Sequence, residues 1–238
     1  MTIQAQELDF KQLNQKIREA NGPLCIKGVY GQRFICSGQK DKNVTIEGTP
    51  GNALGAYLDG GSITVMGNAQ DAVGDTMNDG TIVIHGHAGD ALGLAMRGGS
   101  IFVKKNAGYR TGVHLKEYKD KKPVIVVGGS AGSFLGEYLA GGLIIVLGID
   151  SATAPIGHFC GTGMHGGRIF IRSCKKLNHL PKQVNASIAT AEDLATIAQP
   201  IHDFCAYFGY DAQSLLSDTF YVLKPCEKNP YHQLYTAN

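Results

Sequence analysis

The segment Thr81-Ile82-Val83-Ile84-His85-Gly86 decides the fold, because similar segments recur on both sides of it at a fixed distance. The chain reads SITVMG at 62–67 and SIFVKK at 100–105, so the step is 19 residues. Further copies begin at their first apolar residue, and the full set is Val44, Ile63, Ile82, Ile101, Ile125, Ile144 and Ile169. The period is therefore 19 residues, with insertions of five residues before the fifth copy and six before the seventh.

Each copy begins with an apolar run that is typical of a β-strand. A second apolar column follows two residues later, on the same strand face: Ile46, Val65, Ile84, Val103, Val127, Val146 and Ile171. Other columns are small: Pro50, Ala69, Ala88, Ala107 and Ala131, and then Gly55, Gly74, Gly93, Gly112 and Gly136. Because this period is too short for a helix-pair repeat, the pattern predicts an all-β solenoid, a β-helix of about seven coils over residues 38–174.

The composition agrees with a stacked repeat and excludes several classes of protein. Of the 32 glycines in 238 residues, 28 lie in residues 38–174. A net charge of +2 with 18% charged residues lacks the basic footprint of nucleic-acid-binding proteins. No apolar run has the length of a transmembrane helix, and residues 1–10 lack the apolar core of a signal peptide. We therefore expect a cytoplasmic protein with reduced cysteines and neither nucleic acid nor membrane as a partner.

The flanks are expected to cap the exposed ends of the stack. In residues 1–37 the pattern predicts a helix near residues 6–20 and short strands at Leu24–Lys27 and Arg33–Cys36. This segment is the first of three divisions, followed by the repeats.

The third division, residues 175–238, is predicted to be helical with an extended tail. Ala191–Phe208 has helical spacing, with Thr190 as N-cap, Asp193 at N3 and Gly209 as the stop. Pro200 leaves open whether this is one kinked helix or two. Residues 215–223 suggest a turn or strand, and residues 224–238 an extended arm.

Several motifs invite a functional interpretation. Gly128–Ser133 resembles a phosphate-binding loop but lacks the lysine and the helix of a P-loop, so we interpret its glycines as corners of coils. His85 and His87 are spaced to share a strand face, yet the column through His87 is polar and predicts hydrogen bonds between coils. A metal site is the alternative at these two histidines.

The second insertion carries His158, Cys160, Met164 and His165, a spacing compatible with a soft metal or a Cys–His pair. We favour a glycine-rich loop that packs on a partner.

Stacked carboxylates and a lysine-rich stretch are the remaining candidates. Asp71 and Asp90 share a column with Asn52, which is compatible with glycosidase chemistry but also with turn hydrogen bonds. The first insertion, near 115–123, contains Lys116, Lys119, Lys121 and Lys122 and is interpreted as a solvated loop. We expect the two insertions to mark a docking side.

The repeat carries the pattern Gly-x-x-Gly-x-x-x-Gly, complete at Gly48/Gly51/Gly55, Gly86/Gly89/Gly93 and Gly129/Gly132/Gly136. This resembles the GXGXG-type β-helix domain, which forms the C-terminal part of the glutamate synthase large subunit and also occurs as one of the subunits of formylmethanofuran dehydrogenase. The resemblance implies a right-handed β-helix without catalytic, cofactor-binding or metal residues of its own. In glutamate synthase the partners are an amidotransferase that releases ammonia from glutamine and a synthase part with FMN and iron–sulfur clusters.

The resemblance therefore implies a non-catalytic scaffold subunit of a glutamate synthase-like complex, in the split form where this domain is a separate chain. FMN and the clusters would belong to the partner subunits. Two alternatives stay open: the corresponding formylmethanofuran dehydrogenase subunit and a carbohydrate-active β-helix enzyme. Each function is also compatible with a homo-oligomer of this chain.

Overall fold

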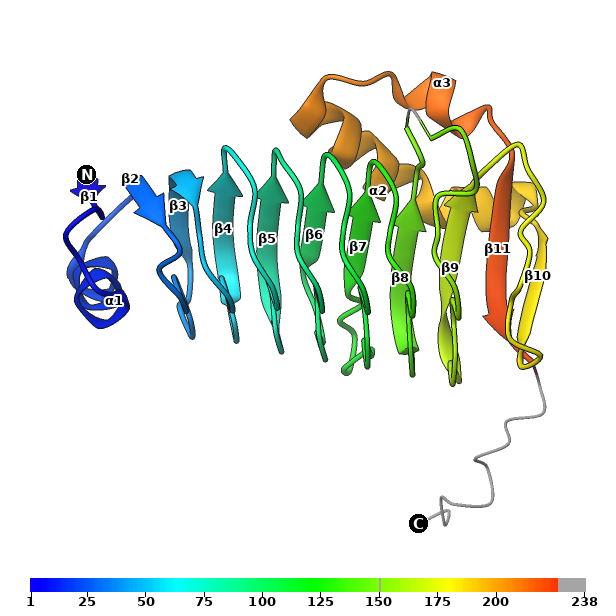
Figure 1. Ribbon diagram of the computed structural model, residues 1–238, viewed down its shortest axis with the longest axis horizontal. Coiled ribbons are helices and arrows are strands. Elements are labelled where there is room, and N and C mark those ends of the chain that lie inside the picture. The colour runs from blue at the N-terminus through cyan, green and yellow to red at the C-terminus, as the bar shows by residue number, and fades with distance from the viewer. Residues whose placement is uncertain (150, 227–238) are drawn as a thin grey trace, which may run out of the picture.

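The strands of the repeat lie side by side in one long sheet (Figure 1). The computed structural model describes residues 1–149 and 151–226. Nine strands pair in parallel in chain order: β1 (Thr2–Gln4), β2 (Leu24–Tyr30), β3 (Lys42–Thr49), β4 (Asp59–Val65), β5 (Asp79–Ile84), β6 (Ser100–Val103), β7 (Val124–Val127), β8 (Ala140–Val146) and β9 (Gly166–Arg172). Two further strands, β11 (Phe220–Pro225) and β10 (Val184–Ile188), extend the sheet in antiparallel fashion beyond β9.

The pairing register confirms the repeat columns and the all-β solenoid. Val44 lies opposite Ile63, Ile63 opposite Ile82, and the column continues in register to Ile169. Isolated bridges likewise pair the alanines of the column from Ala69 to Ala131. Both apolar columns are buried inside the solenoid, where each large aliphatic side chain contributes about 1.5–3 kcal/mol relative to exposure.

The parallel stack begins earlier than the repeat alignment predicts. Leu24 pairs with Val44 and Ile26 with Ile46, and Ile3 pairs in turn with Ile26. The sheet thus continues across the boundary between residues 37 and 38, where the second predicted division begins, and the division itself stays a prediction. Helix α1 (Phe10–Glu19) packs Leu13 and Ile17 into the same core at this end of the stack. It starts later than the predicted residue 6, because Asp9 caps it in a capping box with Gln12.

The predicted strand at Arg33–Cys36 is wrong. Phe34 and Cys36 have φ of 58° and 59°, in the left-handed region. They occupy the corner that Ala53 and Gly55 occupy in the next coil, with φ of 62° and 63°. The apolar side chains of this stretch suggested a strand, but they belong to a turn of the first coil.

The glycine column marks this corner in every later coil. Gly55, Gly74, Gly93, Gly112 and Gly136 have φ between +63° and +70°. A Cβ at any of them would lie within 3 Å of the Cδ1 atom of an isoleucine in the inner column. Gly161 extends the column by one coil, with φ of +73°. Because Cys36 adopts the same left-handed conformation at this corner of the first coil, the distinctive requirement for glycine in the later coils is space.

A second apolar core lies outside the solenoid, under helix α2 (Ala191–Phe208), which crosses the C-terminal half of the sheet (Figure 1). The outward-facing strand residues packed in it are Val83, Phe102, Val126, Ile145 and Phe170. Helix α2 brings Ile197, Ile201, Phe204 and Phe208.

The ends of helix α2 agree with the sequence. Thr190 caps it and Gly209 ends it in the left-handed conformation, as predicted. Pro200 lies inside this one helix. The stretch predicted as a turn or strand at 215–223 contains the end of α3 (Ala212–Leu216) and the start of β11. Most of the predicted arm at 224–238 lies outside the described residues. Within residues 1–149 and 151–226, no helix has the length and apolar character needed to span a membrane.

Candidate functional site

The polar column through His87 connects neighbouring coils by hydrogen bonds, as predicted. The His87 backbone N–H donates to Asn68 Oδ1 at 2.8 Å, and the Asn106 N–H donates to His87 Nδ1 at 3.3 Å. The next N–H, that of Ser130, donates to Asn106 Oδ1 at 2.9 Å. The Nδ1 lone pair of His87 is therefore committed to a hydrogen bond within the solenoid.

His85 points to a different partner. Its ring meets the Phe208 ring of helix α2 edge-on, with centroids 5.2 Å apart and an interplanar angle of 86°. Burial, together with the nearby Lys104, lowers the pKa of His85 below its ordinary value. The two histidines thus serve separate packing and hydrogen-bonding roles.

The stacked carboxylates also bond between coils. Asp71 Oδ1 accepts the Asp90 N–H at 2.9 Å, and Asp90 Oδ1 accepts the Tyr109 N–H at 2.8 Å. Asn52 Oδ1 lies 3.4 Å from the Asp71 nitrogen in the same arrangement. Each side chain satisfies a backbone donor one coil further on, which favours a structural role over glycosidase chemistry.

In the glycine-rich loop at Gly128–Ser133, the backbone N–H groups from Gly128 to Gly132 already donate hydrogen bonds within the protein, which leaves them unable to form a phosphate cradle. Gly128 N–H donates to Val103 O at 2.8 Å, and Gly129 N–H donates to Lys105 O at 2.9 Å. The interpretation of these glycines as corners of coils is thereby supported.

The structure separates the four residues of the second insertion. Cys160 and Met164 are buried in the solenoid core, whereas His158 and His165 are exposed. Burial raises the pKa of the Cys160 thiol to about 12, the opposite of what a nucleophilic cysteine needs. Across residues 1–149 and 151–226, no three His, Cys, Asp or Glu side chains are grouped so that they could hold a metal ion.

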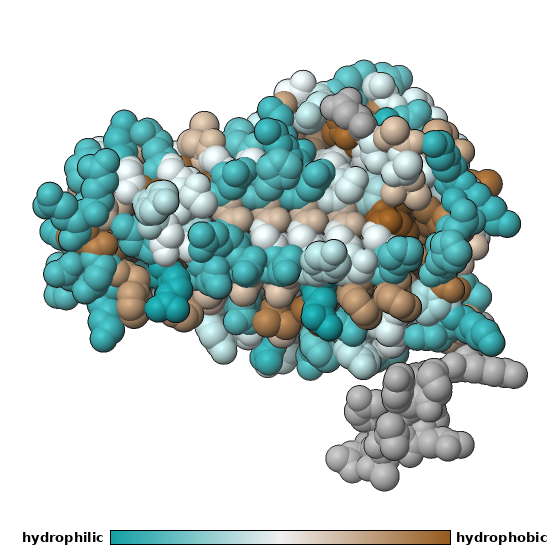
Figure 2. Space-filling view, viewed as in Figure 1, coloured by the Kyte–Doolittle hydropathy of each residue, from teal (hydrophilic) through white to brown (hydrophobic). Residues whose placement is uncertain are grey.

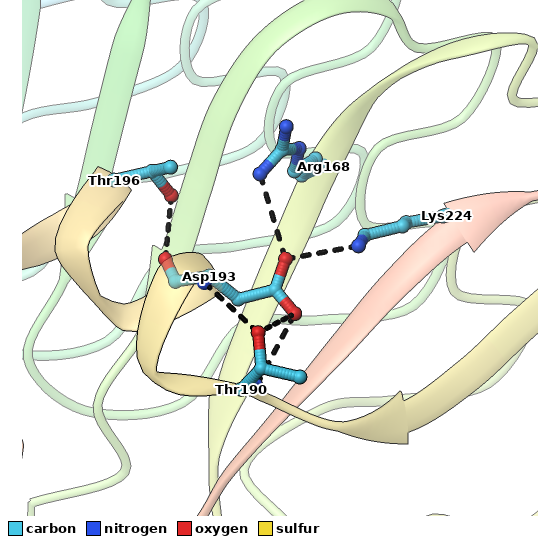
Figure 3. Close-up of polar contacts among 5 residues, drawn as sticks. All are labelled: Arg168, Thr190, Asp193, Thr196 and Lys224. Carbon is cyan, nitrogen blue, oxygen red and sulfur yellow. Dashed lines mark hydrogen bonds and ion pairs between the residues drawn. The ribbon is translucent and has the colours of Figure 1, made fainter.

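Asp193, which the sequence analysis placed only at position N3 of the predicted helix, is the centre of a polar cluster (Figure 3). Asp193 Oδ1 lies 2.9 Å from Lys224 Nζ of β11 and 3.5 Å from an Arg168 guanidinium nitrogen of β9. Its Oδ2 accepts from the Thr190 N–H and hydroxyl at 3.2 and 3.1 Å. The hydrogen bond from Lys224 is the main reason why the pKa of Asp193 lies below its ordinary value. The cluster fastens the start of helix α2 to the end of the sheet.

Comparison with known proteins agrees with this architecture. The family model described as "GXGXG motif" matches residues 11–226. The chain belongs to this family. An uncharacterised protein of Methanocaldococcus jannaschii is 44% identical over 253 aligned positions, which cover 100% of this chain and 97% of the relative. The match to the GXGXG family includes helix α2 and all of helix α1 after Phe10, as well as the repeats.

The two insertions of this GXGXG chain lie at opposite ends of the strands. The first immediately precedes β7, and the second follows β8. Because β7 and β8 are parallel, the first loop lies at the N-terminal ends of the strands and the second at their C-terminal ends (Figure 1). The two insertions thus lie at opposite ends of the strands, and their role in docking stays a prediction.

The lysine-rich insertion is folded back on the solenoid. Tyr118 and Lys121 form a small antiparallel bridge, and Lys121 Nζ lies 2.7 Å from Asp79 Oδ2 and 3.8 Å from Asp59 Oδ1. Part of its positive charge is thus paired within the chain.

In the GXGXG solenoid the connecting segments form an extended face, where Figure 2 shows a belt of pale to light-brown surface between hydrophilic rows.

Proposed function

We propose that this chain is a non-catalytic scaffold subunit of a glutamate synthase-like complex in the cytoplasm. The observation that carries the proposal is that the polar side chains of the repeat form hydrogen bonds within the solenoid. Asp71, Asp90, His87 and Asn106 all accept backbone N–H groups from the next coil, so they are committed to the stack. Membership of the GXGXG family supports the link to a multisubunit enzyme.

In this proposal the chemistry belongs to the partners. An amidotransferase subunit releases ammonia from glutamine, and a synthase subunit with FMN and iron–sulfur clusters uses it to aminate 2-oxoglutarate. The present chain supplies a rigid surface on which these subunits assemble, and it binds no flavin or cluster itself.

Co-expression tests the proposal directly. The chain is produced with the amidotransferase and flavin/iron–sulfur subunits from the same organism, and the complex is isolated by size exclusion. We expect co-elution and glutamine-dependent glutamate formation that falls when this chain is omitted. A stoichiometric flavin or cluster on the isolated chain would refute the scaffold role.

A second candidate, the corresponding β-helix subunit of a formylmethanofuran dehydrogenase-type complex, is favoured by the same Gly-x-x-Gly-x-x-x-Gly pattern. Parallel co-expression with the other subunits of that enzyme separates the two candidates, because the chain should co-elute with only one set. Light scattering of the isolated chain then determines whether it also forms a homo-oligomer.

A further inference from the structure

A cationic groove crosses several coils near the N-terminal ends of β6–β9. It is lined by Arg97, His114, Lys116, Tyr138 and His165, with the small residues Ala95 and Ala140 between them. Arg97, Lys116, Ala140 and His165 occupy equivalent positions in successive coils, and His114 and Tyr138 stand two residues earlier in theirs. The groove thus follows the solenoid axis over three coil steps, about 15 Å.

The charge of the groove is of one sign. No acidic side chain lines it. Within the described part of the chain, neither Arg97 nor Lys116 has an ion pair, and neither side chain donates a hydrogen bond. Two neighbouring cations have partners instead: Lys121 pairs with Asp79, and Arg110 pairs with Glu137 at 3.0 Å. Arg97 and Lys116, one coil apart, therefore offer uncompensated charge to a ligand.

One wall of the groove is a rigid aromatic pair. The His114 and Tyr138 rings are stacked, with centroids 5.1 Å apart and an interplanar angle of 10°. Gly163 continues this column, and a Cβ there would lie 2.6 Å from Tyr138 Cδ1. Arg and Tyr are the residue types that contribute most at protein interfaces.

We propose that this groove docks an acidic segment of a partner protein, with Arg97 and Lys116 binding its Asp or Glu carboxylates. The proposal rests on the proposed function only in that the partner belongs to the same complex. The groove is open to solvent and does not enclose a small molecule. A short cationic patch on a chain of net charge +2 is too small for the extended phosphate contacts of nucleic acids. A guanidinium beside an ammonium and a tyrosine suits carboxylates on a peptide.

The first test uses the isolated full-length chain and a fluorescein-labelled octaglutamate peptide, followed by fluorescence anisotropy. We expect saturable binding that weakens with salt. Arg97→Glu/Lys116→Glu should raise the dissociation constant about tenfold or more. The matched control, Lys11→Glu/Lys105→Glu, changes the net charge equally at exposed sites away from the groove and should leave binding within about twofold. Circular dichroism establishes that all variants are folded.

Three outcomes would refute the proposal that the groove docks an acidic segment. They are an equal loss of octaglutamate binding in both double variants, equal binding of an octalysine peptide, and tighter binding of a single-stranded RNA dodecamer. Any one of them assigns the interaction to general charge or to another class of ligand.

The second test repeats the comparison with the co-expressed subunits. If octaglutamate binds as expected but none of the glutamate synthase-like subunits elutes with the chain, the proposed function fails and the groove stands. If the complex assembles but both double variants support it equally and the peptide does not bind, the groove fails and the scaffold role stands.

Discussion

Gly93→Ala tests whether the corner glycines are required by conformation or by space. Gly93 has φ of +68°, and a Cβ built on it would lie within 3 Å of Ile125 Cδ1. Alanines two residues away on either side, Ala91 and Ala95, adopt φ of 55° and 51°. The left-handed conformation alone is therefore tolerated by alanine in this corner, and the close approach to Ile125 is the distinctive feature of position 93.

The expected cost combines two contributions. An alanine in the left-handed region costs about 1–2 kcal/mol. Forcing a methyl group into a filled core costs about a further 1–3 kcal/mol. We expect Gly93→Ala to lower the free energy of unfolding by about 2–5 kcal/mol, measured by urea titration with circular dichroism.

A double-mutant cycle isolates the steric contribution. Ile125→Val removes the Cδ1 atom and by itself costs about 0.5–1.5 kcal/mol. In the Gly93→Ala background the same change should relieve crowding, so the two losses should fall short of additive by about 1 kcal/mol or more. The control Ala95→Gly should change stability by less than about 1 kcal/mol. Strict additivity in the cycle, or no effect of Gly93→Ala, would show that the glycine is not required for space.

Three further changes test other parts of the structure. Asp193→Ala should cost about 1.5–3 kcal/mol by removing the charged hydrogen bonds to Lys224 and Thr190. Because the folded pKa of Asp193 is lowered, this contribution should be complete above about pH 4, the unfolded value. It should decline as the pH falls through the folded pKa, and a difference between wild type and variant that is independent of pH down to pH 2 would contradict it. Phe204→Ala should cost about 3–5 kcal/mol, read from thermal and urea unfolding, since Phe204 is fully buried between helix α2 and the sheet; a loss below about 1 kcal/mol would argue against that packing. Finally, iodoacetamide at pH 8 should modify exposed Cys174 well before Cys160, whose thiol pKa is raised to about 12; mass spectrometry would reveal the reverse order if Cys160 were accessible.

The inner columns were predictable because they repeat at a constant step. Ile63, Ile82 and Ile101 follow one another every 19 residues, so alignment alone establishes their register. Strand β2 was predicted at Leu24–Lys27, but not as part of the stack, because Leu24 and Ile26 lie 20 residues and not 19 before their partners in β3. Strand β1 was missed, since the chain between Ile3 and Ile26 contains a helix. The false strand at Arg33–Cys36 has the same origin, because its corner geometry is visible only after the first coil is aligned with the second.

The position of helix α2 can be predicted from the outward-facing residues of the strands, although not from the two inner columns. The outward-facing strand residue is polar at Thr45 and Thr64 but apolar from Val83 onward. This change from polar to apolar residues marks the first strand whose outer face packs under helix α2. The ion pairs of Asp193 have no such signal, because Arg168 and Lys224 are 25 and 31 residues away in sequence and meet only through the fold.

Helix α2 packs on only part of the sheet, so the two halves of the molecule should differ in local stability. The outward-facing residues of β3 and β4, Thr45 and Thr64, lie outside the core under helix α2, so opening of these coils in hydrogen exchange should be the easier event. From β5 onward helix α2 fastens several strands across their outer face, which fixes the distances between coils. The residues from Arg97 to His165 belong to this second half. Their backbone spacing is therefore set before an acidic segment binds, so the entropy lost on binding is that of the exposed Arg97 and Lys116 side chains and of the segment itself.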